Sequence, residues 1–196
     1  MSAQSVAVII VAVVVLLIIV TFIVSARMRA RRQRLLRSTF GPEYDVALSQ
    51  KGSRAQAERE LEVRQARHDS IALRALTPQS RQRYMSLWEQ AQARFVDRPR
   101  AALDEADELI RSVMVDRGYP VDSFEQQTAD LSVEHANTLS GYRRAHELLD
   151  QSSPSTEGLR QAMISYRQLF VDLVEKGAGT DEQTQQHTHT GRHAST

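Results

Sequence analysis

A continuous apolar run near the N-terminus constrains this chain more than any other feature. Residues 6–24 are 19 consecutive residues whose only polar member is Thr21. As a helix, this run spans about 28 Å, close to the thickness of the hydrocarbon core of a bilayer. The bilayer core offers no water to unpaired backbone groups, so a helix is the form that such a run takes there. The sequence therefore predicts a transmembrane helix over residues 6–24, within an anchor of residues 1–24.

A cleaved signal peptide is the alternative interpretation of the same run. Signal peptides carry positive charge first, then about 7–15 apolar residues and then a small-residue cleavage site. Residues 1–5 hold no charged side chain and the apolar run is longer, although residues 24–26 (Val-Ser-Ala) faintly resemble a cleavage site. The order of these features favours a retained anchor.

Positive charge follows the apolar run at once, with no acidic residue before Glu43. The positive-inside rule then places the N-terminus outside and the rest of the chain in the cytoplasm, as a single-pass protein of the cell membrane. Cations beside a membrane also attract anionic lipids, so the bilayer and its anionic lipids are predicted partners. The candidate lipid contacts are Arg27, Arg29, Arg31, Arg32, Arg34 and Arg37.

The formal net charge of +1 conceals two regions of opposite sign. Residues 1–37 hold six basic residues and no acid, so the remainder has 19 basic against 24 acidic residues, a charge of −5. A negatively charged domain does not attract nucleic acid, and we exclude that partner. The chain also contains no cysteine, which excludes disulfides, thiol catalysis and cysteine metal sites.

Helical periodicity and the positions of proline divide the rest of the chain. All five prolines lie at the edges of helical patterns, where the missing N–H is tolerated. We predict an all-α fold: a basic juxtamembrane segment (25–37), a spacer (38–76) with a solvated charged helix over 53–68, and a bundle of four to five antiparallel helices (77–176). The tail (177–196) is expected to be disordered.

Local signals also predict where individual helices begin and end. Gly118 is expected to end one helix, and Gly141 is expected to mark a close approach of two helices. The predicted N-caps, all short polar residues ahead of an apolar pattern, are Ser53, Thr77, Asp122, Ser132 and Thr156.

Catalytic and metal-binding patterns are weak in this sequence. The tail histidines His187, His189 and His193 form a cluster, but a flexible tail without an orienting carboxylate is a poor metal site. His68, His135 and His146 lack the partners that nucleophilic catalysis requires at recognisable spacings. We therefore predict no cofactor, no metal and no enzymatic activity.

Aromatic residues offer the one alternative to a purely structural domain. At helical spacing they are most simply core residues, but they can also line a pocket or groove for a peptide or an apolar ligand. The candidates for such a pocket are Tyr84, Trp88, Tyr119, Phe124, Tyr142 and His146.

Several short phrases give the chain a family resemblance. They are the segments 40–45 (FGPEYD), 67–69 (RHD), 92–97 (QARFVD), 117–120 (RGYP), 130–133 (DLSV) and 166–170 (YRQLF). In these the chain resembles an uncharacterised family of short, often membrane-anchored helical proteins from high-GC Gram-positive bacteria. The resemblance covers roughly residues 38–175; it implies the helical architecture and assigns no activity.

Together these observations predict a single-pass membrane protein that presents a small cytoplasmic helical domain to an unknown protein partner. A small-ligand sensor or enzyme with an aromatic-lined pocket is the alternative. The apolar run has no glycine-based small-xxx-small pattern, so the sequence does not predict a specific dimer and leaves the oligomeric state open.

Overall fold

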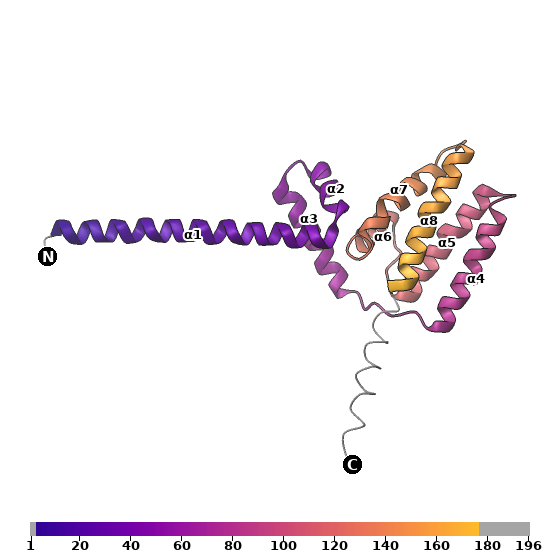
Figure 1. Cartoon of the computed structure of the whole chain (residues 1–196), viewed down its shortest axis with the longest axis horizontal. Coiled ribbons are helices and arrows are strands. Elements are labelled where there is room, and N and C mark those ends of the chain that lie inside the picture. The colour runs from indigo at the N-terminus through magenta and orange to yellow at the C-terminus, as the bar shows by residue number, and fades with distance from the viewer. Residues whose placement is uncertain (1–2, 177–196) are drawn as a thin grey trace, which may run out of the picture.

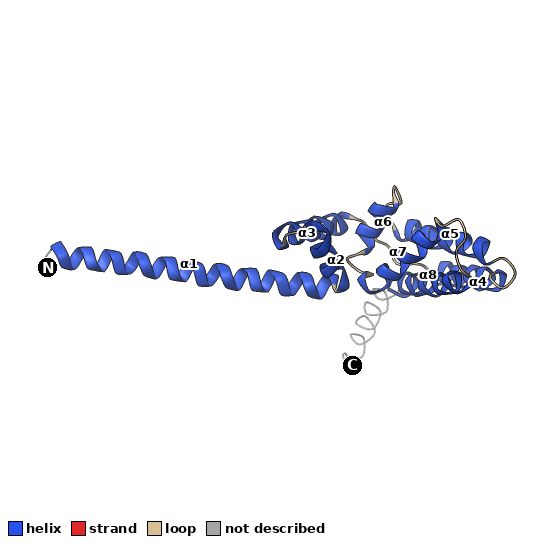
Figure 2. Cartoon of the chain, turned by 90° about the horizontal axis from the view of Figure 1, so that it is seen from above, coloured by secondary structure: helices blue, strands red, loops and turns tan. Residues whose placement is uncertain are grey.

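The computed structural model describes residues 3–176, with side chains from Val14 onward. This part of the chain forms eight α-helices and no strand (Figures 1 and 2), so the all-α prediction is confirmed for it. The predicted disordered tail, with its three histidines, lies outside the described residues. The helices are α1 (Ala3–Phe40), α2 (Pro42–Lys51), α3 (Arg54–Ser70), α4 (Pro78–Arg94), α5 (Pro99–Arg117), α6 (Phe124–Leu131), α7 (Ala136–Leu149) and α8 (Thr156–Lys176).

The prediction of a membrane-spanning helix over residues 6–24 is corrected. Among the described residues, none of the helices combines the length and the apolar character needed to cross a membrane. Residues 6–13 of the predicted span lie outside the described side chains. The predicted single-pass topology, cell-membrane location and orientation all depend on this span and are therefore corrected as well.

Helix α1 extends as a long rod away from the rest of the molecule, and its C-terminal end lies beside α2 and α3 (Figure 1). The chain turns sharply at Gly41, whose φ of 45° suits glycine, and Pro42 starts α2. The end of α1 then packs on α2 and α3 around a small core, here called the N-terminal cluster: Leu36, Phe40, Tyr44, Ala47, Ala57 and Leu61.

The charged helix expected over 53–68 is α3, which is less solvated than its composition suggests. Ser53 caps its N-terminus by accepting a hydrogen bond from the Gln56 amide at 3.3 Å. Ala57, Leu61 and His68 on one face are buried, although most of the helix is charged. Helix α3 therefore belongs to the packed structure and is not a free spacer.

Helices α4 to α8 form an antiparallel bundle around a second, larger core (Figures 1 and 2). Trp88 of α4 stacks on Phe170 of α8, with ring centroids 4.7 Å apart. Helices α7 and α8 approach closely at Gly141, because an added Cβ there would lie 3.1 Å from the Ser165 Oγ. This confirms the predicted close approach and explains why a glycine is placed inside a helix.

Charged contacts join the N-terminal helices to the bundle. Arg143 Nη1 of α7 lies 2.7 and 2.8 Å from the two carboxylate oxygens of Glu43 on α2. Arg67 Nε of α3 lies 2.9 Å from Asp130 Oδ1 of α6. The Glu43 and Asp130 side chains are fully buried. These two ion pairs place α2 and α3 against one side of the bundle.

Candidate functional site

The six arginines after the apolar run are exposed, and the structure separates them into different surroundings. Arg37 pairs with Asp45 at 3.3 Å and lies over the Tyr44 ring, next to the N-terminal cluster. Two others, Arg29 and Arg32, line a cleft of about 680 Å³ between α1 and α3. The remaining three of the six do not line that cleft: Arg27, Arg31 and Arg34.

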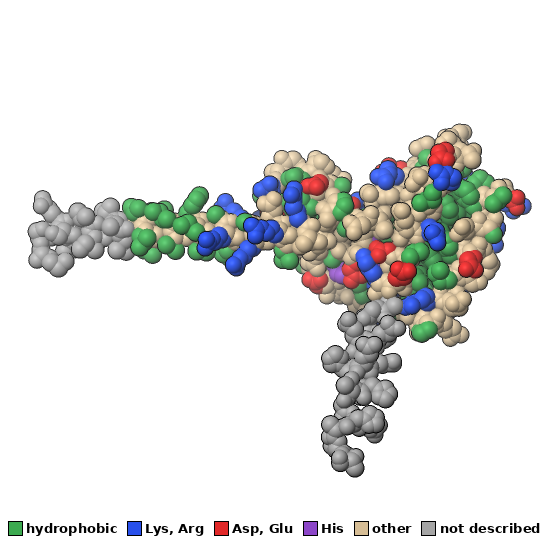
Figure 3. Space-filling view, in the orientation of Figure 1, with side chains coloured by type: hydrophobic (Ala, Val, Ile, Leu, Met, Phe, Trp, Pro, Cys, Tyr) green, Lys and Arg blue, Asp and Glu red, His purple; other side chains and the backbone are tan. Residues whose placement is uncertain are grey.

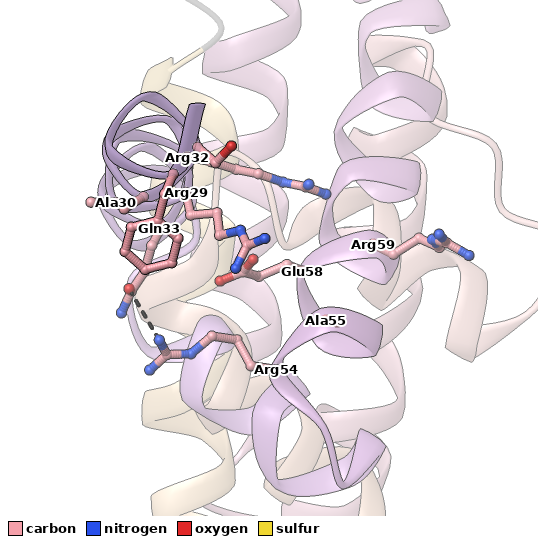
Figure 4. A pocket seen from close by; sticks show the side chains of 11 residues that line it. Arg29, Ala30, Arg32, Gln33, Arg54, Ala55, Glu58 and Arg59 are labelled. Atoms are coloured by element: carbon pink, nitrogen blue, oxygen red, sulfur yellow. Dashed lines mark hydrogen bonds between the residues drawn. The ribbon is translucent and has the colours of Figure 1, made fainter. Parts of the chain in front are cut away.

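The cleft brings together basic residues that are far apart in the sequence. Figure 4 shows Arg29 and Arg32 of α1 and Arg54 of α3 directed into the space between the two helices, whereas Arg59 points away from α1. Arg54 Nη1 donates a hydrogen bond to the Gln33 side-chain oxygen at 3.3 Å.

One acid, Glu58, also faces the cleft (Figure 4). Its Oε1 accepts a hydrogen bond from the Tyr44 hydroxyl at 3.0 Å. Burial and this hydrogen bond raise the pKa of Tyr44. The lining is therefore predominantly cationic, and its single carboxylate is engaged by a neutral donor. We call this arrangement the arginine cleft, with the lining arginines Arg29, Arg32, Arg54 and Arg59.

An apolar surface continues from the arginine cleft along α1 (Figure 3). A shallower hollow of about 460 Å³ shares Phe22, Ser25 and Arg29 with the cleft and extends to Val14. Large apolar side chains over residues 14–24 are 45–73% exposed, and they point in all directions around the helix. A helix that is apolar on every side is typical of a buried environment, yet the described part of the chain leaves this one uncovered.

The six residues proposed to line an aromatic pocket do not surround a common space. Tyr142, Phe124 and His146 lie together, with the Phe124 and His146 rings stacked at 3.8 Å. Trp88 stacks on Phe170 elsewhere in the core, while Tyr84 lies against α5 and donates a hydrogen bond to Asp116 at 2.6 Å. Burial and the bond to Asp116 raise the pKa of Tyr84 to about 12.

The hydroxyl groups of the other two tyrosines are also used within the fold. Tyr142 donates to Asp107 at 3.1 Å and Tyr119 donates to Glu134 at 3.1 Å. Burial is the largest cause that raises the pKa of both tyrosines, and the neighbouring carboxylates add to it. These side chains are packed core residues whose polar ends are satisfied.

A buried polar network that the sequence analysis did not identify centres on His135, at the N-terminus of α7. Its Nδ1 lies 2.7 Å from Asp172 Oδ2, and its Nε2 lies 3.3 Å from Arg117 Nη1. Arginine can only donate, so Nε2 accepts, and the proton is assigned to Nδ1, which donates to Asp172. Burial lowers the pKa of His135 and outweighs the opposing effect of Asp172.

The His135 network serves the packing of α5, α7 and α8. Arg117 Nη1 also donates to the Leu173 carbonyl at 3.3 Å. Burial raises the pKa of Asp172, but the hydrogen bonds from His135 and Lys176 outweigh it and lower the pKa overall. With both ring nitrogens occupied, this histidine has no lone pair available to act as a general base in this arrangement.

The described residues contain no group of three or more His, Asp or Glu side chains that could hold a metal ion. A comparison with known protein families, with curated proteins and with solved structures found no match for this chain.

Proposed function

We propose that this chain is a non-catalytic interaction protein that attaches through α1 to a protein partner and displays the helical bundle beside it. The observation that carries the proposal is the uncovered apolar surface of α1 over residues 14–24. Burial of one large apolar side chain contributes about 1.5–3 kcal/mol, so covering several of them supports a stable complex.

Charge and shape indicate what the partner offers. An apolar helix fits a hydrophobic groove, which is a recurring mode of helix recognition. The next turns of α1 carry exposed arginines outside the arginine cleft, among them Arg27, Arg31 and Arg34. The partner surface is therefore an apolar groove bordered by acidic residues, since complementary charge fixes the register of the bound helix.

Site-specific photo-crosslinking of the full chain in its native cells tests the proposal. A photoreactive residue at Ile18, which is 63% exposed on α1, should capture a protein that the same residue at Val96, 85% exposed in the α4–α5 turn, does not capture. The purified partner should then bind the full chain and lose binding after Ile18→Glu and after Arg31→Glu with Arg34→Glu. Crosslinks from position 18 to lipid alone, or the same proteins from both positions, would contradict the proposal.

A further inference from the structure

The arginine cleft has an excess of positive charge that the fold itself does not neutralise. Elsewhere on these helices, arginines have acidic partners: Arg64 pairs with Glu60 at 3.2 Å, and Arg37 pairs with Asp45 at 3.3 Å. Within the described residues, Arg29 and Arg54 have no carboxylate oxygen within the 4.0 Å limit of an ion pair. Arg32, which also lines the cleft, pairs with Glu62 of α3, so the positive charge that the fold leaves without a carboxylate partner rests on Arg29 and Arg54.

Two helices supply these charges from opposite sides. Arg29 and Arg32 project from α1, and Arg54 projects from the first turn of α3 (Figure 4). Guanidinium groups that converge on one space repel each other, and an anion between them removes that repulsion. Arginine also presents paired N–H donors whose spacing matches the oxygens of a phosphate group.

The N-terminus of α3 adds to this positive potential. The cap at Ser53 satisfies the amides of Gln56 and Ala57, through its Oγ and its carbonyl oxygen respectively. The first turn of α3, with Arg54 and Ala55, lines the cleft. Free amides and the aligned peptide dipoles at a helix N-terminus favour a bound anion.

We propose that the arginine cleft binds a phosphate-bearing anion, held between Arg29 of α1 and Arg54 at the start of α3, beside Arg32 with its partner Glu62. The cleft of about 680 Å³ has room for a group with several phosphates or for one phosphate with an organic substituent. Glu58 faces the same space, and its carboxylate repels the anion. The affinity for the anion is therefore lower than the arginines alone would give. The site adjoins the apolar surface at 14–24, with which it shares Phe22, but the proposal rests on the arginines and not on that surface.

Binding of pyrophosphate to the full chain, measured by calorimetry, is the first arm of the test. Arg29→Gln with Arg54→Gln should weaken binding at least tenfold. Arg31→Gln with Arg34→Gln removes the same charge from exposed positions of α1 outside the cleft and should change the affinity less than twofold. Glu58→Gln should strengthen binding several-fold, because its amide oxygen can still accept from Tyr44 while the repulsive charge is lost.

Vesicles form the second arm and separate a soluble phosphate from a lipid headgroup. The full chain is mixed with neutral phosphatidylcholine vesicles, with or without anionic phosphatidylglycerol. Extra retention by the anionic vesicles that Arg29→Gln with Arg54→Gln abolishes, and that Arg31→Gln with Arg34→Gln preserves, also supports the site and assigns the phosphate to lipid. Equal losses in both double variants, or no binding in either arm, would overturn the proposal.

Discussion

A single buried ion pair, Glu43 with Arg143, holds α2 against α7. The Glu43 side chain is fully buried, and Arg143 Nη1 contacts both of its oxygens. Two charges removed from water contribute little net stability as a pair, but one of them left alone is strongly unfavourable. Removal of one partner should therefore be strongly destabilising, whereas removal of both should change the stability little.

Arg143→Met should weaken the docking of α2 by about 3–5 kcal/mol, because it leaves the Glu43 carboxylate buried without a partner. Amide hydrogen exchange in α2 measures this loss. Adding Glu43→Gln removes the second charge and should restore most of the protection. Arg144→Met alters an exposed neighbour on the same helix and should have an effect within about 0.5 kcal/mol. Equal exchange in the single and double variants would show that the pair is not coupled.

His135 should make the stability of the bundle dependent on pH. Its ordinary pKa is 6.5, and burial lowers the pKa in the folded protein. On acidification the unfolded chain therefore takes up a proton before the folded protein does. The stability contributed by neutral His135 is complete above pH 6.5 and is lost as the pH falls through the lowered pKa of the folded state.

His135→Asn isolates this effect, because the asparagine amide can still donate to Asp172 but does not titrate. Between about pH 7.5 and 5, urea unfolding should show a greater loss of stability for the native chain than for the variant, by about 1.4 kcal/mol for each unit of pKa lowering. His68 and His146 are present in both proteins and cancel in the comparison. Parallel pH profiles would contradict this role. Asp172 does not contribute in this range, because its pKa is lowered from 3.8.

At the level of single helices, turn and cap chemistry decides where elements begin and end. Gly118 ends α5 with a φ of 92°, as the sequence predicts, and the linker 71–77 crosses just above it. An added Cβ at Gly118 would lie 2.8 Å from the Ala72 carbonyl oxygen. Arg74 also donates its amide to the Arg117 carbonyl at 2.9 Å, so the linker is fixed to the end of α5.

Gly118→Ala should therefore be more destabilising than Gly52→Ala. Gly52 also has a left-handed φ, 68°, but nothing lies within 4 Å of an added Cβ there. Both variants carry the left-handed penalty of about 1–2 kcal/mol, and only Gly118→Ala also forces the linker away from α5. Urea unfolding of the two variants should differ by about 1 kcal/mol or more. Equal losses of stability in the two variants would contradict this prediction, because they would mean that the linker moves away from α5 at no cost in free energy.

Cap positions show how far local sequence signals reach. Ser53 and Thr77 are confirmed as N-caps. These two were predictable because each stands alone as a strong capping residue ahead of its helix. The predicted N-cap at Asp122 is wrong by one residue, because the neighbouring Ser123 accepts the hydrogen bond from the Gln126 amide. The prediction of Ser132 as an N-cap is wrong. Ser132 lies at the C-terminal end of α6, and its hydroxyl donates to the Ala129 carbonyl. Where several capping residues are adjacent, the sequence does not rank them.

The predicted N-cap Thr156 is also wrong by one residue, because the Ser155 hydroxyl accepts from the Gly158 amide at the start of α8.

The candidate site is even harder to predict from the sequence. The arginines at the end of the apolar run are visible as a cluster, but Arg54 joins Arg29 only because the chain reverses at Gly41 and Gly52. No short-range spacing encodes that meeting, nor the pairing of Glu43 with a residue 100 positions away.

On the scale of the whole molecule, the described part of the chain holds two cores of very different size. The bundle core contains 23 buried hydrophobic residues, whereas the N-terminal cluster contains six. Buried apolar area is the main source of stability, so the smaller core alone supports little. The ion pairs Glu43–Arg143 and Arg67–Asp130 therefore carry much of the attachment of α2 and α3 to the bundle.

This imbalance predicts that the chain unfolds in two stages, with α2 and α3 opening before the bundle. The single tryptophan, Trp88, is buried in the bundle core, so its fluorescence reports the bundle alone, while circular dichroism reports all helices. In a urea titration, the circular dichroism signal should begin to fall before the fluorescence changes. Arg143→Met should move the first stage to lower urea and leave the Trp88 transition in place. Superimposable curves would contradict this, because they would mean that six buried residues and two ion pairs couple the N-terminal helices fully to the bundle.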